Sequence, residues 1–270
     1  KTMVAAACAY FCVKNGRQAA LMAPTEILAR QHYEGLAPLM EPMGIRCALL
    51  TGASTAKEKK AVAARLAAGE IDFILGTHAL ITGGVEYKRL GLVVTDEQHR
   101  FGVGQRAALA GKGDHPHTLV MSATPIPRTL ALILYGDLDV SVIDQLPPGR
   151  RPVQTSLVDS SYHPRIYKFL RKLVGEGRQV YIVCPAVSES EEDGDGRKAV
   201  TEYAAQLQQE VFPDLRVAYV HGKMKPKEKD AVMSAFAARE TDILVSTTVI
   251  EVGVDVPNAA VLVVENAERF

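Results

Sequence analysis

The sequence predicts an α/β fold made of two domains, each a mainly parallel sheet flanked by helices. Short apolar runs rich in Val, Ile and Leu alternate with longer segments of helical spacing. Several of these runs end in Thr, Gly, Asp or Glu, and ligands of parallel sheets bind at the carboxyl ends of the strands. A proline-rich break divides the chain, and the part after it repeats the alternation of the part before it.

Before the break, the chain opens with an apolar, Ala-rich helix that starts near Met3. Strands are then expected at 18–23, 47–52, 73–78, 92–95 and 118–124, with helices at 27–33 and 57–67. Thr25 is suited to cap the helix after the first strand, because a threonine hydroxyl accepts a hydrogen bond from a free helix N–H. Strand–helix alternation at this spacing forms right-handed βαβ units and therefore a parallel sheet.

The break is the segment 146–152, Leu-Pro-Pro-Gly-Arg-Arg-Pro, which is predicted to be a semi-rigid linker. We therefore expect a first domain at 1–146, a linker at 147–156 and a second domain at 157–270. After the linker, strands are expected at 180–184, 217–220, 243–246 and 260–264, with one helix ending at Glu210 and another at 226–238. An acidic, glycine-rich run between Ser188 and Lys198 is expected to be a solvated loop.

Composition bounds the class of protein. Hydrophobic residues make up 47% and charged residues 23%, as in ordinary soluble domains. No apolar run approaches the roughly 20 residues of a membrane helix, and no secretory signal opens the chain, so a cytoplasmic protein is expected. The formal net charge is zero, so nucleic-acid binding cannot be inferred from overall charge. The cysteines lack metal-ligand spacing and are expected to be buried free thiols: Cys8, Cys12, Cys47 and Cys184.

Two adjacent carboxylates, Asp96 and Glu97, follow the apolar strand at 92–95. Desolvating an ionised carboxylate is costly, and a Mg²⁺ ion would compensate the pair. Asp96 is predicted to hold the metal of a nucleoside triphosphate, and Glu97 to orient and deprotonate the attacking water. Taken alone, the pair is explained equally well as a cap for the following helix.

The first two residues form a second candidate feature. Lys1-Thr2 leads directly into the Ala-rich helix, as the last two residues of a P-loop do. Any chain can begin with this dipeptide, so the indication is weak. If it is a P-loop end, the glycines that cradle the phosphates would precede Lys1, and we expect weakened nucleotide binding by the chain as it stands.

Six stretches resemble, in order, motifs Ia, Ib, II, III, IV and V of superfamily 2 helicases. They are PTEILA at 24–29, GTHAL at 76–80, DEQHRFGV at 96–103, SATPIPRT at 122–129, HGKM at 221–224 and STTVIEVGVDVP at 246–257. The resemblance spans nearly the whole chain. It implies two RecA-like domains facing each other across a cleft, truncated at both ends, in the motor core of an ATP-dependent DNA helicase or translocase. Such a motor, expected to be monomeric, remodels branched or forked duplex DNA in recombination and repair.

The resemblance also implies roles for individual residues, with ATP and Mg²⁺ as cofactors. Asp96 and Glu97 are the catalytic pair, and Asp96 and Thr2 hold the metal. The nucleotide is held by Lys1, Thr2 and Asp96, and approached from the second domain by Gly253 and Asp255. Coupling of the nucleotide to DNA falls to Gln98, His99, Ser122 and Thr124, although Ser122 and Thr124 also suit the capping of a turn. Contacts to DNA phosphates, which position without reading sequence, fall to Thr25, Gly52, Thr77, His221 and Gly222.

The resemblance places the arginine-finger motif after Phe270, so negligible ATPase activity is expected of these 270 residues alone. Other functions remain open. One is a related double-stranded DNA translocase that displaces a bound protein, which only flanking domains would distinguish. Another is a nucleic-acid-binding scaffold without ATPase activity, against which the intact Asp96 and Glu97 argue. A generic α/β binding module is the third, and the ordered motifs argue against it.

Overall fold

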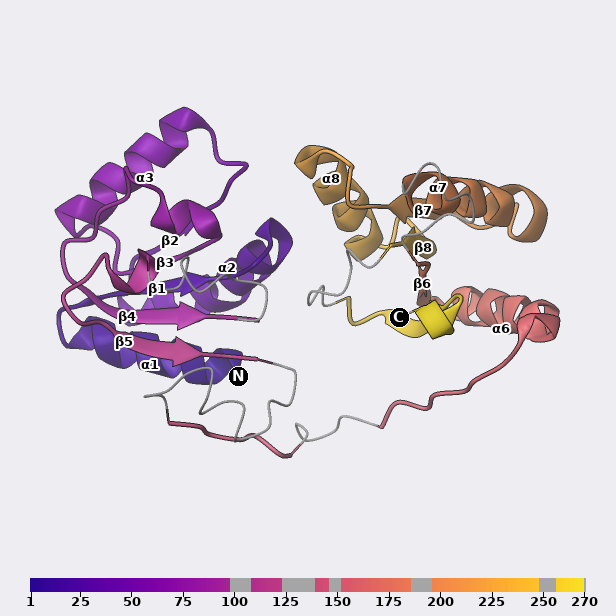
Figure 1. Cartoon of the computed structure of the whole chain (residues 1–270), viewed down its shortest axis with the longest axis horizontal. Helices are drawn as coiled ribbons and strands as arrows, with labels where there is room; N and C mark the ends of the chain where they lie inside the picture. Colours follow the sequence, from indigo (N-terminus) through magenta and orange to yellow (C-terminus); the bar gives the residue numbers. More distant parts are fainter. Residues whose placement is uncertain (98–107, 123–138, 146–151, 186–195, 248–255, 270) are drawn as a thin grey trace.

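The computed structural model describes residues 1–97, 108–122, 139–145, 152–185, 196–247 and 256–269 (Figure 1). It contains two parallel sheets, one five-stranded in the order β2-β3-β1-β4-β5 and one four-stranded in the order β7-β8-β6-β9. The predicted α/β class with two parallel sheets is therefore confirmed. The proposed linker at 147–156 lies partly outside the described residues, and its described part, 152–156, forms no helix or strand.

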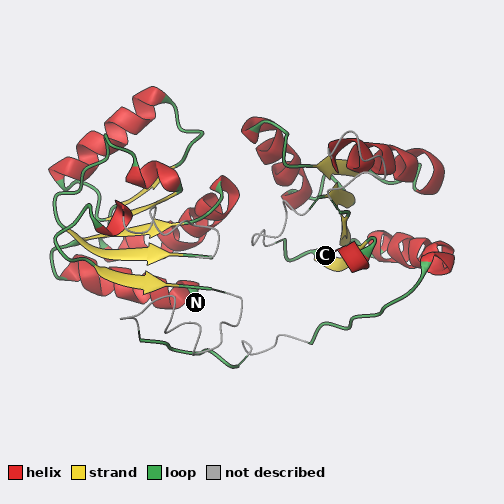
Figure 2. Ribbon diagram, viewed as in Figure 1, coloured by secondary structure: helices red, strands yellow, loops and turns green. Residues whose placement is uncertain are grey.

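The first sheet consists of β1 (Gln18–Met22), β2 (Cys47–Leu50), β3 (Phe73–Gly76), β4 (Leu90–Thr95) and β5 (His117–Val120). Its helices are α1 (Thr2–Lys14), α2 (Glu26–Met40) and α3 (Ala56–Ala68). One core cluster joins α1 and α2 to one face, and another joins α3 to the opposite face, so helices cover both sides (Figure 2). Every residue of β1 is buried, which explains its apolar sequence.

Local signals set the helix starts of this half. Thr25 caps α2, accepting a hydrogen bond from the Leu28 N–H at 3.3 Å, as predicted. Thr55 caps α3 in a capping box with Glu58. The expected strand at 73–78 is too long, because β3 ends at Gly76 and His78–Ile81 forms a 3₁₀ helix.

The second sheet consists of β6 (Gln179–Val183), β7 (Val217–Val220), β8 (Ile243–Ser246) and β9 (Ala259–Val264). Its helices are α6 (His163–Gly175), α7 (Gly196–Gln206), which continues into a π-helical turn at Leu207–Val211, and α8 (Pro226–Ala237). Short 3₁₀ helices occur at Glu41–Met43, Ser160–Tyr162 and Ala267–Arg269. Of the loop expected between Ser188 and Lys198, the part at 188–195 lies outside the described residues. The rest was wrongly expected to be loop, because α7 begins at Gly196.

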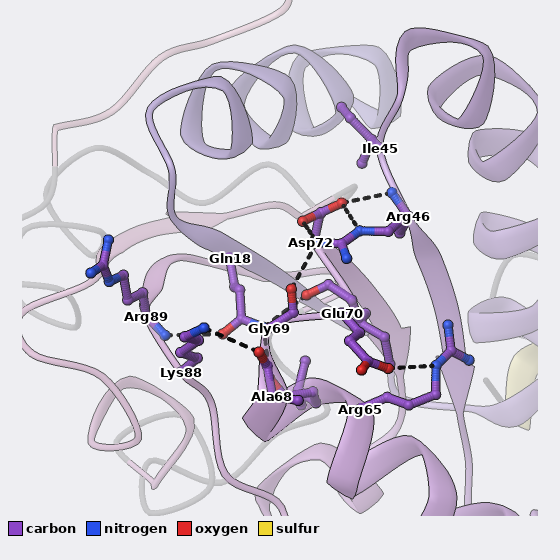
Figure 3. Close-up of polar contacts among 12 residues, drawn as sticks. Gln18, Ile45, Arg46, Arg65, Ala68, Gly69, Glu70, Asp72, Lys88 and Arg89 are labelled. Atoms are coloured by element: carbon purple, nitrogen blue, oxygen red, sulfur yellow. Dashed lines mark hydrogen bonds and ion pairs between the residues drawn. The ribbon is translucent and has the colours of Figure 1, made fainter.

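The two sheets are built alike, element for element. The path β1-α2-β2-α3-β3-β4 corresponds to β6-α7-β7-α8-β8-β9, and the strand orders match, with β5 added in the first sheet. Arg46 forms a two-pronged ion pair with Asp72 (Figure 3), and Arg216 does the same with Asp242, each guanidinium Nη2 lying 2.7 Å from the Oδ1. The sequence separation is 26 residues in both pairs. The second half is therefore a structural repeat of the first.

Buried glutamines fasten corresponding strands in both halves. The Gln18 amide nitrogen donates to the carbonyls of Leu66 (2.9 Å) and Ile71 (2.7 Å), while its oxygen accepts from the Arg89 N–H (3.0 Å). Gln179 occupies the matching place at the start of β6 and donates to Phe236 and Thr241. Gln18 thus ties β1 to the turn between α3 and β3 (Figure 3). Gln179 likewise ties β6 to the turn between α8 and β8.

Two further observations bear on the class of protein. Within the described ranges, no helix combines the length and apolarity that a bilayer crossing needs. The four cysteines are free thiols; Cys184 is buried, whereas Cys8, Cys12 and Cys47 are only half-buried. The expectation of burial is therefore correct for one of them and too strong for the others.

Candidate nucleotide site at the strand ends

The candidate site lies where the parallel strands of the first sheet end. Ladder hydrogen bonds continue one residue past the strands: the Asp96 N–H donates to the Met22 carbonyl at 3.0 Å, and the Met121 N–H donates to the Thr95 carbonyl at 2.8 Å. Asp96 and Ser122 therefore leave the sheet at the same edge, as the sequence predicted. The arrowheads of β4 and β5 point towards the second half of the chain (Figure 1).

Both oxygens of the Asp96 carboxylate have a hydrogen-bond partner in the protein. Oδ1 accepts a hydrogen bond from the Glu97 N–H at 3.0 Å, and Oδ2 lies 2.8 Å from Nε2 of His32 in α2. The side chains of His32 and Asp96 are 8% and 10% exposed. Burial alone would raise the pKa of Asp96, but the hydrogen bond and charge of His32, the charge of Lys1 and the Glu97 N–H together lower it. Asp96 is therefore ionised and fixed in one orientation.

Glu97 and Lys1 complete the charged part of the site. Glu97 adopts a left-handed backbone with φ of 47°, a conformation that non-glycine residues rarely take and that is concentrated at functional sites. Its Oε1 lies 3.4 Å from the Lys1 Nζ. Lys1, which is predicted to bind the nucleotide, and Glu97, which is predicted to activate the water, thus lie together although they are far apart in the sequence.

A pocket of about 340 Å³ adjoins these groups, and its lining includes Thr2, His32, Asp96 and Glu97, with Met3, Leu28, Leu36 and Leu39 as its apolar wall. Carboxylate and hydroxyl oxygens are the ligands that Mg²⁺ prefers. In the parts of the chain that the structure describes, no group of three or more His, Cys, Asp or Glu side chains is arranged to hold a metal ion by itself. This donor set fits Mg²⁺ carried in by a nucleotide, because such an ion needs only one or two carboxylates from the protein.

The predicted phosphate contacts of the first half gather at the same edge. Glu26, next to Thr25, accepts a hydrogen bond from the Ala53 N–H at 2.7 Å and so fixes the turn after Gly52. A Cβ on Gly52 would lie 2.8 Å from the Glu26 Oε1, so a larger residue there would displace the carboxylate that holds this turn. Thr77 is only 2% exposed, and its hydroxyl lacks a hydrogen-bond partner among the described residues. The Thr77 hydroxyl therefore lies below the protein surface in this structure.

The turn at His221 and Gly222 is the counterpart of the turn at Gly52. The Lys59 Nζ donates to the Gly52 carbonyl at 2.7 Å, and the Lys229 Nζ donates to the Gly222 carbonyl at 2.5 Å. His221 is buried and stacks on Tyr219, with ring centroids 6.0 Å apart. The two predicted phosphate turns are therefore equivalent positions of the structural repeat.

Five predicted site residues lie outside the described residues: Gln98, His99, Thr124, Gly253 and Asp255. Sequence reasoning did not single out His32, whose partner Asp96 is 64 positions away. A signal was present, because a histidine lies between Leu28 and Leu36 on the apolar face of an expected helix, where an unpaired polar group is costly.

Comparison with known proteins identifies the family. Residues 1–133 match the DEAD/DEAH box helicase model, and residues 165–269 match the helicase conserved C-terminal domain model. The whole chain is 51% identical to the ATP-dependent DNA helicase RecG of Synechocystis, and 51% identical to that of Thermotoga maritima. This chain belongs to the RecG helicase family. A RecG structure bound to a three-way DNA junction matches 94% of the chain with a TM-score of 0.74 and 49% identity.

RecG membership confirms the resemblance to superfamily 2 helicases and, with the two parallel sheets, the two RecA-like domains. The chain covers 32% of the Synechocystis RecG, 34% of the Thermotoga maritima RecG and 32% of the chain in the junction complex. It therefore spans about a third of the length of these two RecG proteins. The alternatives of a protein-displacing translocase, an inactive scaffold or a generic binding module are not favoured by these matches.

Proposed function

We propose that this chain is the motor of an ATP-dependent DNA helicase that remodels branched DNA in recombination and repair. The observation that carries the proposal is the buried Asp96 carboxylate, held in one orientation in a pocket that Thr2 and Glu97 also line, with Lys1 paired to Glu97. The matched relatives are ATP-dependent DNA helicases, and one RecG is known in complex with a three-way DNA junction. We assign a cytoplasmic location and a monomeric motor to this function.

The nucleotide site is assigned to the first sheet. Thr2 and Asp96 would hold Mg²⁺, and Lys1 would bind the phosphates of ATP. ATP, the substrate, would supply the phosphoryl group, and Mg²⁺ held by Thr2 and Asp96 would offset its negative charge. Glu97 orients the attacking water and accepts its proton. The Lys1 side chain is 36% exposed, which leaves it free to turn from Glu97 to a phosphate.

The remaining predicted residues take their roles in the same scheme. Gly253 and Asp255 approach the nucleotide from the second domain, and the coupling residues are Gln98, His99, Ser122 and Thr124. DNA phosphates would be contacted at the two equivalent turns, by Gly52 in the first half and by His221 and Gly222 in the second, together with Thr25. Thr77 is assigned to the same phosphate contacts, although its buried hydroxyl would first have to be uncovered to reach the DNA. The proposed domain boundaries are 1–146 and 157–270, joined by 147–156.

The proposal is tested by ATP hydrolysis in the full-length protein, with forked, junction and linear DNA compared. Forked or junction DNA should stimulate hydrolysis more than linear duplex. Glu97→Gln keeps the size of the side chain and removes the base, so turnover should fall by about 10²–10⁴-fold while Mg²⁺-ATP binding is retained. Glu70→Gln, an exposed carboxylate paired with Arg65 away from the pocket, is the control and should hydrolyse ATP normally. Near-normal DNA-stimulated hydrolysis in Glu97→Gln would remove Glu97 from the role.

A further inference from the structure

His32 is a buried histidine to which the proposed reaction assigns no role. It lies on the face of α2 that packs into the first core cluster, next to Leu28 and Leu36, and is 7% exposed. A polar ring in such a place is costly unless it is hydrogen-bonded. Its Nε2 meets the Asp96 Oδ2 at 2.8 Å, and it lines the same pocket as Thr2 and Glu97.

The contacts of Asp96 show what the histidine does to that carboxylate. Each carboxylate oxygen has two lone pairs. The Glu97 N–H uses one on Oδ1, and His32 uses one on Oδ2, so rotation about the Cβ–Cγ bond would break both hydrogen bonds. One lone pair on each oxygen remains for another ligand. The carboxylate is therefore fixed at both oxygens and still able to bind a cation.

We propose that His32 is the positioning residue of the Mg²⁺-binding carboxylate, holding Asp96 in the orientation that receives the metal of the nucleotide. The proposal rests on the proposed function, because it takes Asp96 as a metal-binding group. Groups that hydrogen-bond to metal ligands orient them in this way, and their loss weakens metal affinity. His32 itself contacts neither the nucleotide nor the metal in this assignment.

The structural repeat supplies an internal comparison. Glu265 follows β9 as Asp96 follows β4, and its N–H donates to the Val183 carbonyl at 2.9 Å, as that of Asp96 does to Met22. The Tyr203 hydroxyl of α7 donates to the Glu265 Oε1 at 2.8 Å, as His32 of α2 contacts Asp96. The next residue is left-handed in both turns, with φ of 47° at Glu97 and 49° at Asn266.

The two turns differ in the residue that comes directly after the hydrogen-bonded carboxylate. Glu97 comes after Asp96, whereas the uncharged Asn266 comes after Glu265, so the second turn lacks the water-activating carboxylate. In both halves, a hydrogen bond between a helix side chain and the carboxylate after a strand therefore anchors that helix. Only in the first half does this hydrogen bond act on the proposed metal site. Tyr203→Phe removes such a bond outside the nucleotide site, which makes it the matched control for a purely structural role.

The test compares His32→Gln with His32→Met in the full-length protein. The two replacements have similar size, but only glutamine can donate a hydrogen bond to Asp96. The first readout is the free Mg²⁺ concentration that half-maximally supports binding of a fluorescent ADP analogue, and the second is the melting temperature. His32→Met should raise the half-saturating Mg²⁺ concentration by about 10- to 100-fold, and His32→Gln by less than about threefold. Tyr203→Phe should lower the melting temperature and leave the Mg²⁺ requirement unchanged.

Each outcome supports or overturns the positioning role. An unchanged Mg²⁺ requirement in His32→Met overturns the proposal. Equal losses in His32→Gln and His32→Met also overturn it, because then the hydrogen bond is not what matters. If His32→Met fails to fold, His32→Phe replaces it as the variant without a donor, with the same criteria. If the unmodified protein binds the nucleotide without any Mg²⁺ dependence, or if Asp96→Asn keeps that dependence, the proposed function of Asp96 itself is wrong.

Discussion

Replacing Gln18 by leucine should selectively destabilise the first half of the chain. The glutamine is 5% exposed and makes three hydrogen bonds, two to the carbonyls of Leu66 and Ile71 and one from the Arg89 N–H. Leucine has similar size but makes none of them. Losing three hydrogen bonds of about 1 kcal/mol each, with added cost for polar groups left buried, predicts a loss of about 3–5 kcal/mol.

The assay is thermal unfolding of the full-length protein followed by scanning calorimetry. For a unit of this size, that loss should lower the Tm of one transition by about 10–20 °C. Gln179→Leu removes the corresponding bonds to Phe236 and Thr241, so it should lower a different transition. The pair of variants therefore tests both the energetic role of the glutamines and the independence of the two domains.

Two results would refute this reasoning. A Tm shift below about 2 °C for Gln18→Leu would mean that water or other groups replace its hydrogen bonds at little cost. A single transition lowered equally by both variants would mean that the two halves unfold as one unit, against the proposed boundaries at 146 and 157.

Two further predictions concern stability. A Cβ at Gly76 would lie 2.0 Å from the Leu50 carbonyl oxygen, so Gly76→Ala should force β2 and β3 apart and cost about 1–3 kcal/mol or more, measured by urea unfolding; Gly83→Ala, where a Cβ meets nothing within 4 Å, is the control. The second concerns pH. Hydrogen bonds from Arg46 and Arg216 hold the pKa values of Asp72 and Asp242 below the usual range, against the opposing effect of burial. A carboxyl group whose pKa is lower in the folded state than in the unfolded chain stabilises the fold at pH values above its unfolded-state pKa of about 3.9. That stabilisation is lost as the pH falls through the folded-state pKa. The urea midpoint should therefore drop in this acid range, and less so in an Asp72→Asn, Asp242→Asn double variant; an equal drop would exclude these pairs as the cause.

Much of the fold could be predicted because the strands are short apolar runs buried on both faces. The polar residues after the strands were correctly placed at one edge, since parallel strands end together. Thr25 was identified as a cap because capping depends on a few local atoms. The helix α6 was not predicted, although its sequence, HPRIYKFLRKLVG, places Ile166, Leu170 and Val174 at helical spacing against the core of the second sheet.

Contacts between distant segments were harder to predict. The His32 contact with Asp96 depends on how α2 packs against β4, which no local pattern encodes. The structural repeat, by contrast, was readable: Arg46 and Asp72 have the same separation as Arg216 and Asp242, and both glycine turns have a lysine seven residues later. The half-buried cysteines show the opposite error, because apolar neighbours in the sequence do not guarantee burial in the fold.

The most direct test of the central claim is an experimental structure of the full-length protein with Mg²⁺ and a non-hydrolysable ATP analogue. The account predicts Mg²⁺ beside Thr2 and Asp96, the phosphates on Lys1, a water held by Glu97 opposite the terminal phosphate, and the bond between His32 and Asp96 intact. A nucleotide bound elsewhere, or a metal bound without Asp96, would contradict the assignment of this strand end as the ATP site.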